Sequence, residues 1–201
     1  MSGDRLAWLL TFVMCGICGI ALFDTSATVD AGAIRQMTDA MVHRGPDDEG
    51  LLIRGRHGLG HRRLTIIDLN SGKQPLSNED GTVWTVFNGE LYNYQEIRAR
   101  LEGLGHVFST TTDTEVIVHL YEEDGDAFVE SLQGMFAIAV LDLRQDRLVL
   151  VRDRLGIKPL YYKESTSGFE FASEIKSLLA GIGGPCELDI NVVHRFLTFT
   201  Y

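Results

Sequence analysis

Strand patterns occur in runs along this chain instead of alternating one for one with helix patterns. Residues 15–23 are continuously apolar, as in a buried strand. Residues 51–54 and 59–67 are apolar-polar stretches separated by Gly55 and Gly58, which predicts paired strands. Grouping of this kind favours an α+β fold over a doubly wound α/β sheet.

Two predicted helices separate an N-terminal block of strands from a C-terminal block. One covers residues 94–101 and follows the pattern Asn93-x-x-Glu96, and the other follows Thr112-x-x-Glu115. Both patterns resemble capping boxes, in which two side chains satisfy the first backbone amides of a helix. Further strands are predicted at residues 82–87, 135–141, 148–151, 160–162 and 170–172, and further helices at 33–43, 174–180 and 190–199.

The dipeptide Asn88-Gly89 follows the strand predicted at residues 82–87 and allows two interpretations. Asn-Gly is a strong signal for a hairpin turn, which is the simpler interpretation. The asparagine amide and the glycine N–H could also donate two hydrogen bonds to a developing oxyanion. On these residues alone the turn is favoured.

Composition restricts the class of protein. A chain of 201 residues with 45% apolar residues is long enough for one substantial domain. The net charge of −10, without a basic run, argues against a nucleic-acid partner. The three cysteines at positions 15, 18 and 186 are too few for a disulfide framework, so we expect a reducing, cytoplasmic location.

The N-terminal segment is uncharged from residue 6 to residue 23. That length reaches the lower limit of a membrane span and resembles the core of a secretion signal. Against both, Asp4 offsets the charge of Arg5, no small-x-small cleavage site ends the run, and its second half predicts a buried strand. We therefore interpret residues 1–14 as an apolar leader, which either precedes an alternative start or is removed as a propeptide.

Cys15 directly follows the internal Met14. If Cys15 becomes the first residue, it carries both a thiol and a free α-amine. The pKa of an α-amine is about 7.7–8.0, so it can act as a base at neutral pH, whereas a peptide nitrogen cannot.

Cys15 and Cys18 also form a C-x-x-C pattern, typical of redox pairs and zinc half-sites. A zinc site needs further ligands at suitable spacing, but the only other cysteine is Cys186. A redox pair belongs at a helix N-terminus, and this one lies in a strand-like run. We therefore predict no metal site and interpret Cys18 as a buried core residue. None of the six histidines is an obvious partner for a cysteine in a catalytic Cys-His pair.

Charged residues near the middle of the chain fit a zwitterionic ligand. Arg62 and Arg63 lie in an apolar strand, where alternation turns one of them inward. An arginine can bind a carboxylate with two hydrogen bonds, and Asp113 could pair with an ammonium. Asp113 also begins a predicted helix, and on these residues alone simple stabilisation of the helix dipole is the favoured interpretation.

Motifs distributed along the chain resemble the class II, N-terminal-nucleophile glutamine amidotransferase domains, most closely the domain found in glutamine-hydrolysing asparagine synthetases. The motifs that carry this resemblance are Met14-Cys15-Gly16-Ile17, His43-Arg44-Gly45-Pro46-Asp47, Gly60-His61-Arg62-Arg63-Leu64-Thr65-Ile66-Ile67-Asp68, Gln74-Pro75-Leu76, Asn88-Gly89-Glu90-Leu91-Tyr92-Asn93, Asp113-Thr114-Glu115, Gln133-Gly134-Met135-Phe136-Ala137 and Arg152-Asp153-Arg154-Leu155-Gly156-Ile157-Lys158-Pro159-Leu160-Tyr161.

The resemblance implies a four-layer αββα sandwich of the N-terminal-nucleophile hydrolase type. It further implies that Cys15 is the nucleophile and that its own α-amine is the general base. Asn88 and Gly89 would form the oxyanion hole, and Arg44 would brace the N-terminal residue.

The resemblance also implies a binding site for L-glutamine. Arg63 would hold the substrate carboxylate and Asp113 its ammonium. Glu90, together with the backbone near Ile66 and Ile67, would complete the pocket. Glutamine would be hydrolysed to glutamate and ammonia through a thioester on the nucleophile.

In the family, ammonia passes to a C-terminal synthetase domain, which activates aspartate with ATP and magnesium. The chain departs from this pattern, because fourteen residues precede Cys15 and the synthetase domain is absent. We therefore expect residues 15–201 to be an amidotransferase domain truncated before its synthetase partner, with no cofactor of its own and with homodimerisation left open. The competing expectation is a catalytically silent binding or membrane-associated module, in which the leader blocks Cys15.

Overall fold

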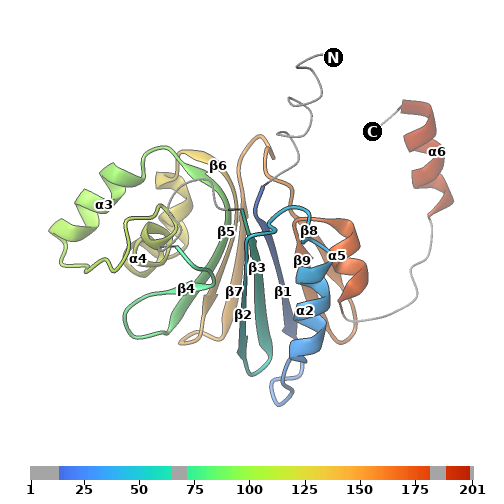
Figure 1. The fold of residues 1–201 in the computed structure, drawn as a ribbon, viewed down its shortest axis with the longest axis horizontal. Coiled ribbons are helices and arrows are strands. Elements are labelled where there is room, and N and C mark those ends of the chain that lie inside the picture. The colour runs from blue at the N-terminus through green and yellow to red at the C-terminus, as the bar shows by residue number, and fades with distance from the viewer. Residues whose placement is uncertain (1–13, 65–71, 182–188, 200–201) are drawn as a thin grey trace.

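The structure is a computed structural model that describes residues 14–64, 72–181 and 189–199. Two antiparallel sheets lie face to face in the middle of the molecule, and helices cover the outer face of each sheet (Figure 1). The predicted α+β class and the four-layer αββα sandwich are therefore confirmed. Among the described residues, no helix combines the length and the apolar character that crossing a bilayer requires.

The first sheet contains five strands in the order β2-β3-β1-β9-β8. Helices α2 and α5 pack on its outer face. The elements of this half are β1 (Gly16–Leu22), α2 (Ala31–Asp39), β2 (Asp48–Arg54), β3 (His57–Arg63), β8 (Tyr161–Glu164), β9 (Gly168–Ala172) and α5 (Ile175–Ala180).

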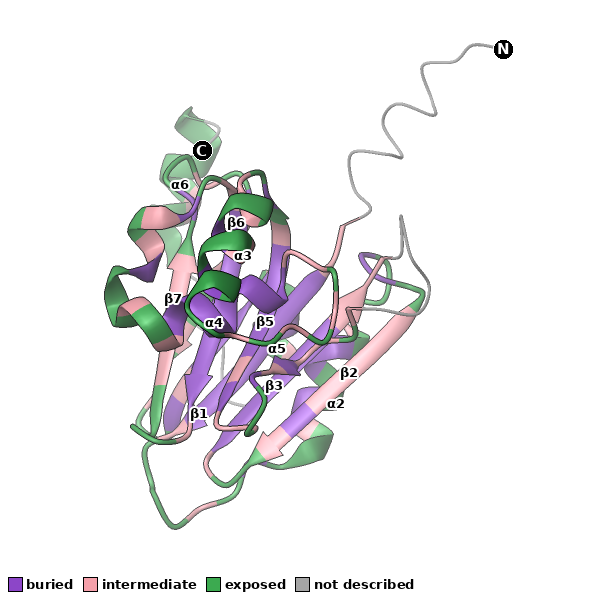
Figure 2. Cartoon of the chain, turned by 90° about the vertical axis from the view of Figure 1, so that its left-hand side faces the viewer, coloured by how far each residue is buried: buried purple, intermediate pink, exposed green. Residues whose placement is uncertain are grey.

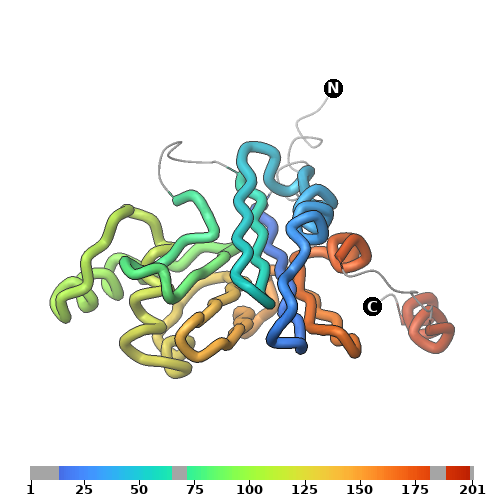
Figure 3. The backbone as a smooth tube through the Cα atoms, turned by 90° about the horizontal axis from the view of Figure 1, so that it is seen from below, coloured from blue at the N-terminus to red at the C-terminus, as the bar shows by residue number. Residues whose placement is uncertain are grey.

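The second sheet contains four strands in the order β4-β5-β6-β7, with α3 and α4 on its outer face (Figure 1). Its elements are β4 (Leu76–Ser77), β5 (Val83–Leu91), α3 (Tyr94–Gly103), α4 (Glu115–Asp124), the 3-10 helix η1 (Gly125–Ser131), β6 (Gly134–Asp142) and β7 (Arg147–Arg152). The last helix, α6 (Ile190–Phe199), lies apart from the sandwich in Figure 3 and buries none of its residues.

Apolar side chains fill each of the three spaces between layers. Ile17, Val86 and Phe171 belong to the core between the two sheets. Ile34 belongs to the core under α2, and Leu120 to the core under α4. Burial is continuous along the central strands in Figure 2. Alternate residues of the strands therefore point into different cores, which fixes the register of every strand that carries a site residue.

The structure corrects the turn predicted at Asn88-Gly89. Strand β5 continues through both residues, and Gly89 pairs with Phe136 of β6. A β-carbon on Gly89 would collide with the carbonyl oxygen of Met135. The glycine is therefore needed because two backbones approach closely within a sheet, and the turn interpretation was wrong.

Both predicted capping boxes are also wrong, although both helices exist. Asn93 makes no side-chain bond to the first turn of α3 and instead donates its amide to the Ser131 carbonyl oxygen at 2.9 Å. The first residue of α4, Glu115, accepts hydrogen bonds from the backbone N–H groups of Ser109 and Thr110 at 2.7 and 2.6 Å. These side chains tie the helices to neighbouring loops instead of capping them.

The predicted helix at residues 33–43 is shorter than expected. Helix α2 ends at Asp39, and the next residues form turns, with the N–H of Arg44 bonded to the Met41 carbonyl oxygen at 2.9 Å. The turns leave Arg44 buried beside the beginning of β1, where it contacts Cys15.

Candidate active site

A small cavity of about 180 Å³ lies where β1 begins, β3 ends and α4 begins. Its walls come from segments that are far apart in the sequence. The lining residues are Cys15, His61, Arg63, Gly72, Gln74, Phe87, Gly89, Thr112, Asp113 and Thr114. Four of the residues predicted for the site, Cys15, Arg63, Gly89 and Asp113, therefore line the same cavity.

The Cys15 thiol is protonated in its present surroundings. Burial raises the pKa of the thiol above its ordinary value, and the positive charges of Arg63 and Arg44 offset only part of that effect. The Sγ atom lies 3.9 Å from the carbonyl oxygen of Leu64. A protonated thiol is a weak nucleophile, so chemistry at Cys15 requires a base close to the sulfur.

Arg44 fixes the backbone of Cys15. Its Nε atom donates a hydrogen bond to the Cys15 carbonyl oxygen at 3.1 Å, and its side chain is only 8% exposed. Glu174 holds the other end of the guanidinium through a 3.1 Å hydrogen bond from Nη1. His43 and Lys176 contact the same carboxylate at 2.9 and 3.2 Å. The sequence predicted no role for Glu174, which lies two residues after the end of β9.

Arg63 and Asp113 place opposite charges at the cavity. Arg63 ends β3, and its neighbour Arg62 points to the other face, where Nε donates to the Thr38 carbonyl oxygen at 3.2 Å. Asp113 is held by the Leu91 N–H, which donates to Oδ2 at 3.1 Å. Burial raises the pKa of Asp113 above its ordinary value. A buried carboxylate of this kind favours a cationic partner.

The remaining predicted residues lie beside the cavity or outside the described residues. Asn88 is 1% exposed, and its Nδ2 atom has no hydrogen-bond partner within the described part of the chain. Asn88 precedes Gly89 in β5 and is not among the lining residues, and neither is the exposed Glu90. Ile66 and Ile67 lie outside the described residues. A buried amide without a partner is a donor still available to a ligand.

Two of the lining residues that were not predicted for the site, His61 and Gln74, have clear structural roles. His61 and Arg63 are two apart in β3, so alternation places both on the same face, and this signal could have identified His61. Burial lowers the pKa of His61 to about 4, so its ring is neutral at pH 7. Gln74 accepts the Phe87 N–H at 2.6 Å and donates to Thr114 at 3.3 Å, which ties β5 to the start of α4.

A buried lysine lies next to the residue that precedes Cys15. The Nζ atom of Lys158 is 2.9 Å from the sulfur of Met14, and Lys158 is 6% exposed. Burial lowers its pKa, and the charge of Arg44 acts in the same direction. The Met14 side chain and the Cys15 backbone are therefore each in contact with a cationic side chain.

Cys18 has no part in this cavity. Its side chain is fully buried in the core under α2, on the opposite face of β1 from Ile17. Cys15 and Cys18 are both free thiols. The interpretation of Cys18 as a core residue is confirmed, and the C-x-x-C pattern does not mark a redox pair in this structure.

A larger hollow of about 530 Å³ lies between η1, the ends of β6 and β7, and the loop after β7. Val129, Leu132, Val151, Leu155 and Ile157 contribute to its lining. Among the described residues that line it there is no cysteine, histidine, serine or threonine, so these residues offer no nucleophile of the kind found at Cys15. The smaller cavity is therefore the candidate active site.

Comparisons with solved structures agree with the fold. Glutamine phosphoribosylpyrophosphate amidotransferase from Bacillus subtilis, complexed with ADP and GMP, superposes with a TM-score of 0.66 at 22% identity over 82% of this chain and 43% of its own. A second structure, described as the allosteric regulatory enzyme of purine biosynthesis, gives a TM-score of 0.67 at 22% identity over 83% of this chain and 43% of its own.

Sequence comparisons identify the family. Asparagine synthetase [glutamine-hydrolyzing] 2 of Bacillus subtilis (strain 168) is 48% identical over 169 residues, which are 83% of this chain and 22% of the relative. The corresponding enzyme of Zea mays is 42% identical over 187 residues, 92% of this chain and 30% of the relative. The chain thus spans less than a third of the length of either relative. The sequence profile of the glutamine amidotransferase domain matches residues 14–201. The chain belongs to the glutamine amidotransferase domain family.

Proposed function

We propose that this domain hydrolyses L-glutamine to glutamate and ammonia, with Cys15 as the nucleophile. One observation carries the proposal: the Cys15 thiol shares a small cavity with an arginine, Arg63, and a half-buried carboxylate, Asp113. Free glutamine carries an anionic carboxylate and a cationic ammonium, and these two side chains have the complementary charges. The relatives named as glutamine-hydrolysing support the same substrate.

In the proposed substrate complex, Arg63 binds the α-carboxylate and Asp113 binds the α-ammonium of glutamine. Glu90, Ile66 and Ile67 complete the pocket. A bidentate arginine-carboxylate pair orients the substrate as well as binding it. The side-chain amide of glutamine then extends toward the sulfur of the nucleophile.

The proposed base is the α-amine of Cys15, present once residues 1–14 are absent. It accepts the thiol proton as sulfur attacks the amide carbon of glutamine. Asn88 and Gly89 donate hydrogen bonds to the oxyanion of the tetrahedral intermediate. The protonated α-amine returns that proton to the leaving nitrogen, so the carbon–nitrogen bond breaks and ammonia leaves. Water then hydrolyses the thioester, which releases glutamate and restores the thiol. His61 is poorly suited to replace the amine, because its pKa of about 4 is far below that of the buried thiol.

The relatives are asparagine synthetases, which supports a proposal for the wider reaction. We propose that the ammonia is used by a C-terminal synthetase domain that binds ATP and magnesium and amidates aspartate. The profile match begins at Met14, which supports the assignment of residues 15–201 to the amidotransferase domain. The proposed compartment is the cytoplasm, which the small number of cysteines favours.

The test compares two chains that differ only at the N-terminus, one beginning at Met1 and one at Cys15. Release of glutamate from L-glutamine is measured for both, with intact mass establishing each N-terminus. The chain beginning at Cys15 should turn over glutamine, and retaining residues 1–14 should slow it by about 10²- to 10⁴-fold, because the base is lost.

Cys15→Ala in the shorter chain should abolish turnover without changing the circular dichroism spectrum, and Cys18→Ser serves as the matched thiol control. Turnover that survives Cys15→Ala would rule out the proposed nucleophile. A folded chain beginning at Cys15 that releases no glutamate would instead support the silent module that binds without hydrolysis.

A further inference from the structure

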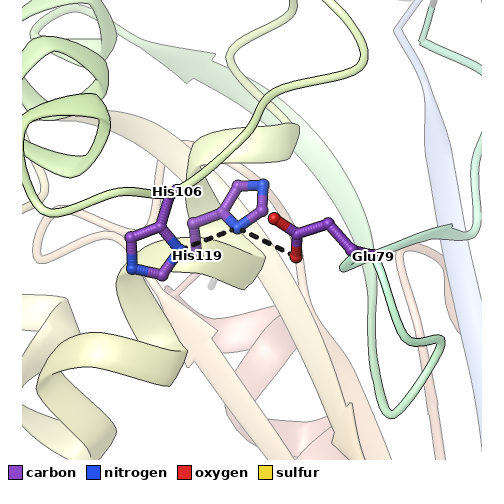
Figure 4. A group of neighbouring side chains, drawn as sticks. All are labelled: Glu79, His106 and His119. Carbon is purple, nitrogen blue, oxygen red and sulfur yellow. Dashed lines mark hydrogen bonds and ion pairs between the residues drawn. The ribbon is translucent and has the colours of Figure 1, made fainter.

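Outside the candidate active site, three side chains that can ligate a metal meet on the outer helical layer of the second sheet. Glu79 lies in the turn after β4, His106 in the loop after α3, and His119 in α4, and their ring and carboxylate groups point toward one another (Figure 4). One ligand atom from each lies within 4.8 Å of the other two. His119 is 1% exposed, His106 is half-buried and Glu79 is exposed.

The separation of the two histidine nitrogens fits coordination to one ion. Nδ1 of His106 lies 3.2 Å from Nδ1 of His119. Zinc binds imidazole nitrogen at about 2.0–2.1 Å in tetrahedral geometry, so two such ligands lie about 3.3–3.4 Å apart. The Oε2 atom of Glu79 is 3.8 Å from Nδ1 of His119, so a small movement of this exposed side chain completes the set.

A carboxylate lies on the far side of the His106 ring, where Nε2 is 3.2 Å from Oε2 of Glu123. A carboxylate at Nε2 favours the tautomer with the proton on that atom, which leaves Nδ1 of His106 free to act as a ligand. In His119, Nε2 is 3.8 Å from Oε1 of Glu115 and has no hydrogen-bond partner among the described residues. The two Nδ1 atoms lie within hydrogen-bond distance of each other, and a cation between them would replace the shared proton with two ligand bonds.

Further acidic groups add negative charge at the same point. The Val107 N–H donates to Oε1 of Glu79 at 3.3 Å, so Oε2 is the oxygen directed at the histidines. Glu122 places Oε2 3.7 Å from Nδ1 of His119, while its Oε1 accepts from Asn78 at 2.8 Å. Arg144 contacts that Oε1 at 3.5 Å, so the basic group lies on the side of Glu122 away from the rings.

We propose that Glu79, His106 and His119 bind a divalent first-row transition ion such as zinc, with Glu122 beside the fourth position. Two imidazoles and a carboxylate are typical ligands for such ions. The ligands come from three separate segments, so the ion would link the turn after β4, the loop after α3, and α4. Helix α4 begins directly after Asp113 and Thr114, so the linked segment is the one that carries Asp113 to the cavity.

The test uses the tag-free chain after removal of metal, titrated with Co²⁺ and separately with Zn²⁺. Binding of one equivalent of Co²⁺ should produce the visible absorption of a tetrahedral site, and Zn²⁺ should displace it and raise the midpoint of thermal unfolding. His106→Gln and Glu79→Gln should each weaken Co²⁺ binding by at least about tenfold, and Glu123→Gln by about 10- to 100-fold through loss of ring orientation.

Two control variants make the assignment specific. His194→Gln removes an exposed histidine of α6 and should leave the affinity unchanged. Cys15→Ala should also leave it unchanged, whereas a sulfur-to-cobalt charge-transfer band lost in that variant would place the ion at the thiol. Absence of stoichiometric binding, or binding that His106→Gln and Glu79→Gln do not weaken, would overturn the proposal. None of these measurements depends on glutamine hydrolysis.

Discussion

Cys15 and Asp113 are both half-buried at the cavity, and this placement affects the ionisation of each group. Burial raises the pKa of both groups, and cationic side chains offset part of the effect at the thiol. A group whose protonated form is favoured by the fold destabilises the folded state once it ionises. Asp113 should therefore decrease the stability of the domain at neutral pH while serving glutamine binding.

Asp113→Asn tests this exchange between stability and binding. Because the folded-state pKa is raised, the aspartate favours the folded state below its unfolded-state pKa and loses that advantage as pH rises through the folded-state pKa. The variant should unfold at a higher temperature than the parent chain at pH 7, and the difference should disappear near pH 3. The KM for glutamine should rise strongly, because the ammonium loses its partner.

Asp24→Asn is the matched control for that experiment. Hydrogen bonds from Ser26 lower the pKa of this exposed aspartate. Its carboxylate therefore stabilises the folded state above the unfolded-state pKa, which is the opposite of the effect expected for Asp113. The control should lower stability slightly at pH 7 and leave KM unchanged. A stabilised Asp24→Asn together with a destabilised Asp113→Asn would contradict the electrostatic account.

Glu174 is a positioning residue for Cys15 because it holds Arg44, which in turn holds the Cys15 carbonyl oxygen. Glu174→Gln should reduce kcat by about 10- to 100-fold with little change in KM, because misplacement of the nucleophile does not affect the groups that bind glutamine. Lys176→Gln removes a more exposed partner of the same carboxylate and should have a small effect. A rise in KM without a fall in kcat would argue against this role.

At single positions, much of the candidate site could be predicted. Cys15 was singled out by its chemistry, whereas the roles of Arg63 and Asp113 came from the resemblance to the family, and the structure brings the three together. His61 was missed because alternation along β3 was applied to the arginines and not to the residue two positions earlier. Glu174 was missed because its partner Arg44 is 130 positions away in the sequence.

Among the elements, strand β5 departs most from expectation, since a turn signal lies within a continuous strand. Local propensity favours a turn for Asn-Gly, but pairing with β6 overrides it. The capping boxes were wrong for a related reason, since Glu115 is 2% exposed and accepts a hydrogen bond from Ser109 in the loop before the helix. Contacts outside the element itself therefore decided the structure both at β5 and at the start of α4.

Gly89→Ala should show that β5 requires glycine for close packing. The added methyl group would meet the Met135 carbonyl oxygen, so we expect a loss of about 1–3 kcal/mol in the free energy of unfolding. Gly103→Ala, at the end of α3 with no atom within 4 Å of the added carbon, should be neutral or stabilise by up to about 1 kcal/mol. Equal stability losses in urea unfolding for the two variants would contradict the packing argument.

For the whole molecule, the α+β class followed from the grouping of strands, and the four layers followed from the resemblance. The order of strands in the first sheet could not be predicted. Strand β1 lies between β3 and β9, and β9 is more than 140 positions further along the chain than β1. Pairing over that separation leaves no periodic signal in the sequence. The inter-sheet core depends on this pairing.

Phe171→Ala tests the inter-sheet core. Phe171 is fully buried between the sheets, and its truncation should lower the free energy of unfolding by about 3–5 kcal/mol in urea. Phe196→Ala is the matched control, because that ring is 58% exposed on α6, and its effect should stay within about 0.5 kcal/mol. A comparable loss from both variants would show that α6 packs more closely than its exposure indicates.

The most direct test of the central claim is covalent labelling of Cys15 with a glutamine analogue that carries an electrophile in place of the side-chain amide. In the chain beginning at Cys15, peptide mass spectrometry should find the label on Cys15 and not on Cys18. L-Glutamine should protect the thiol, and Arg63→Ala should slow labelling strongly. Labelling of Cys15 that glutamine does not slow, or no labelling of Cys15 at all, would contradict a glutamine-binding site built around this thiol.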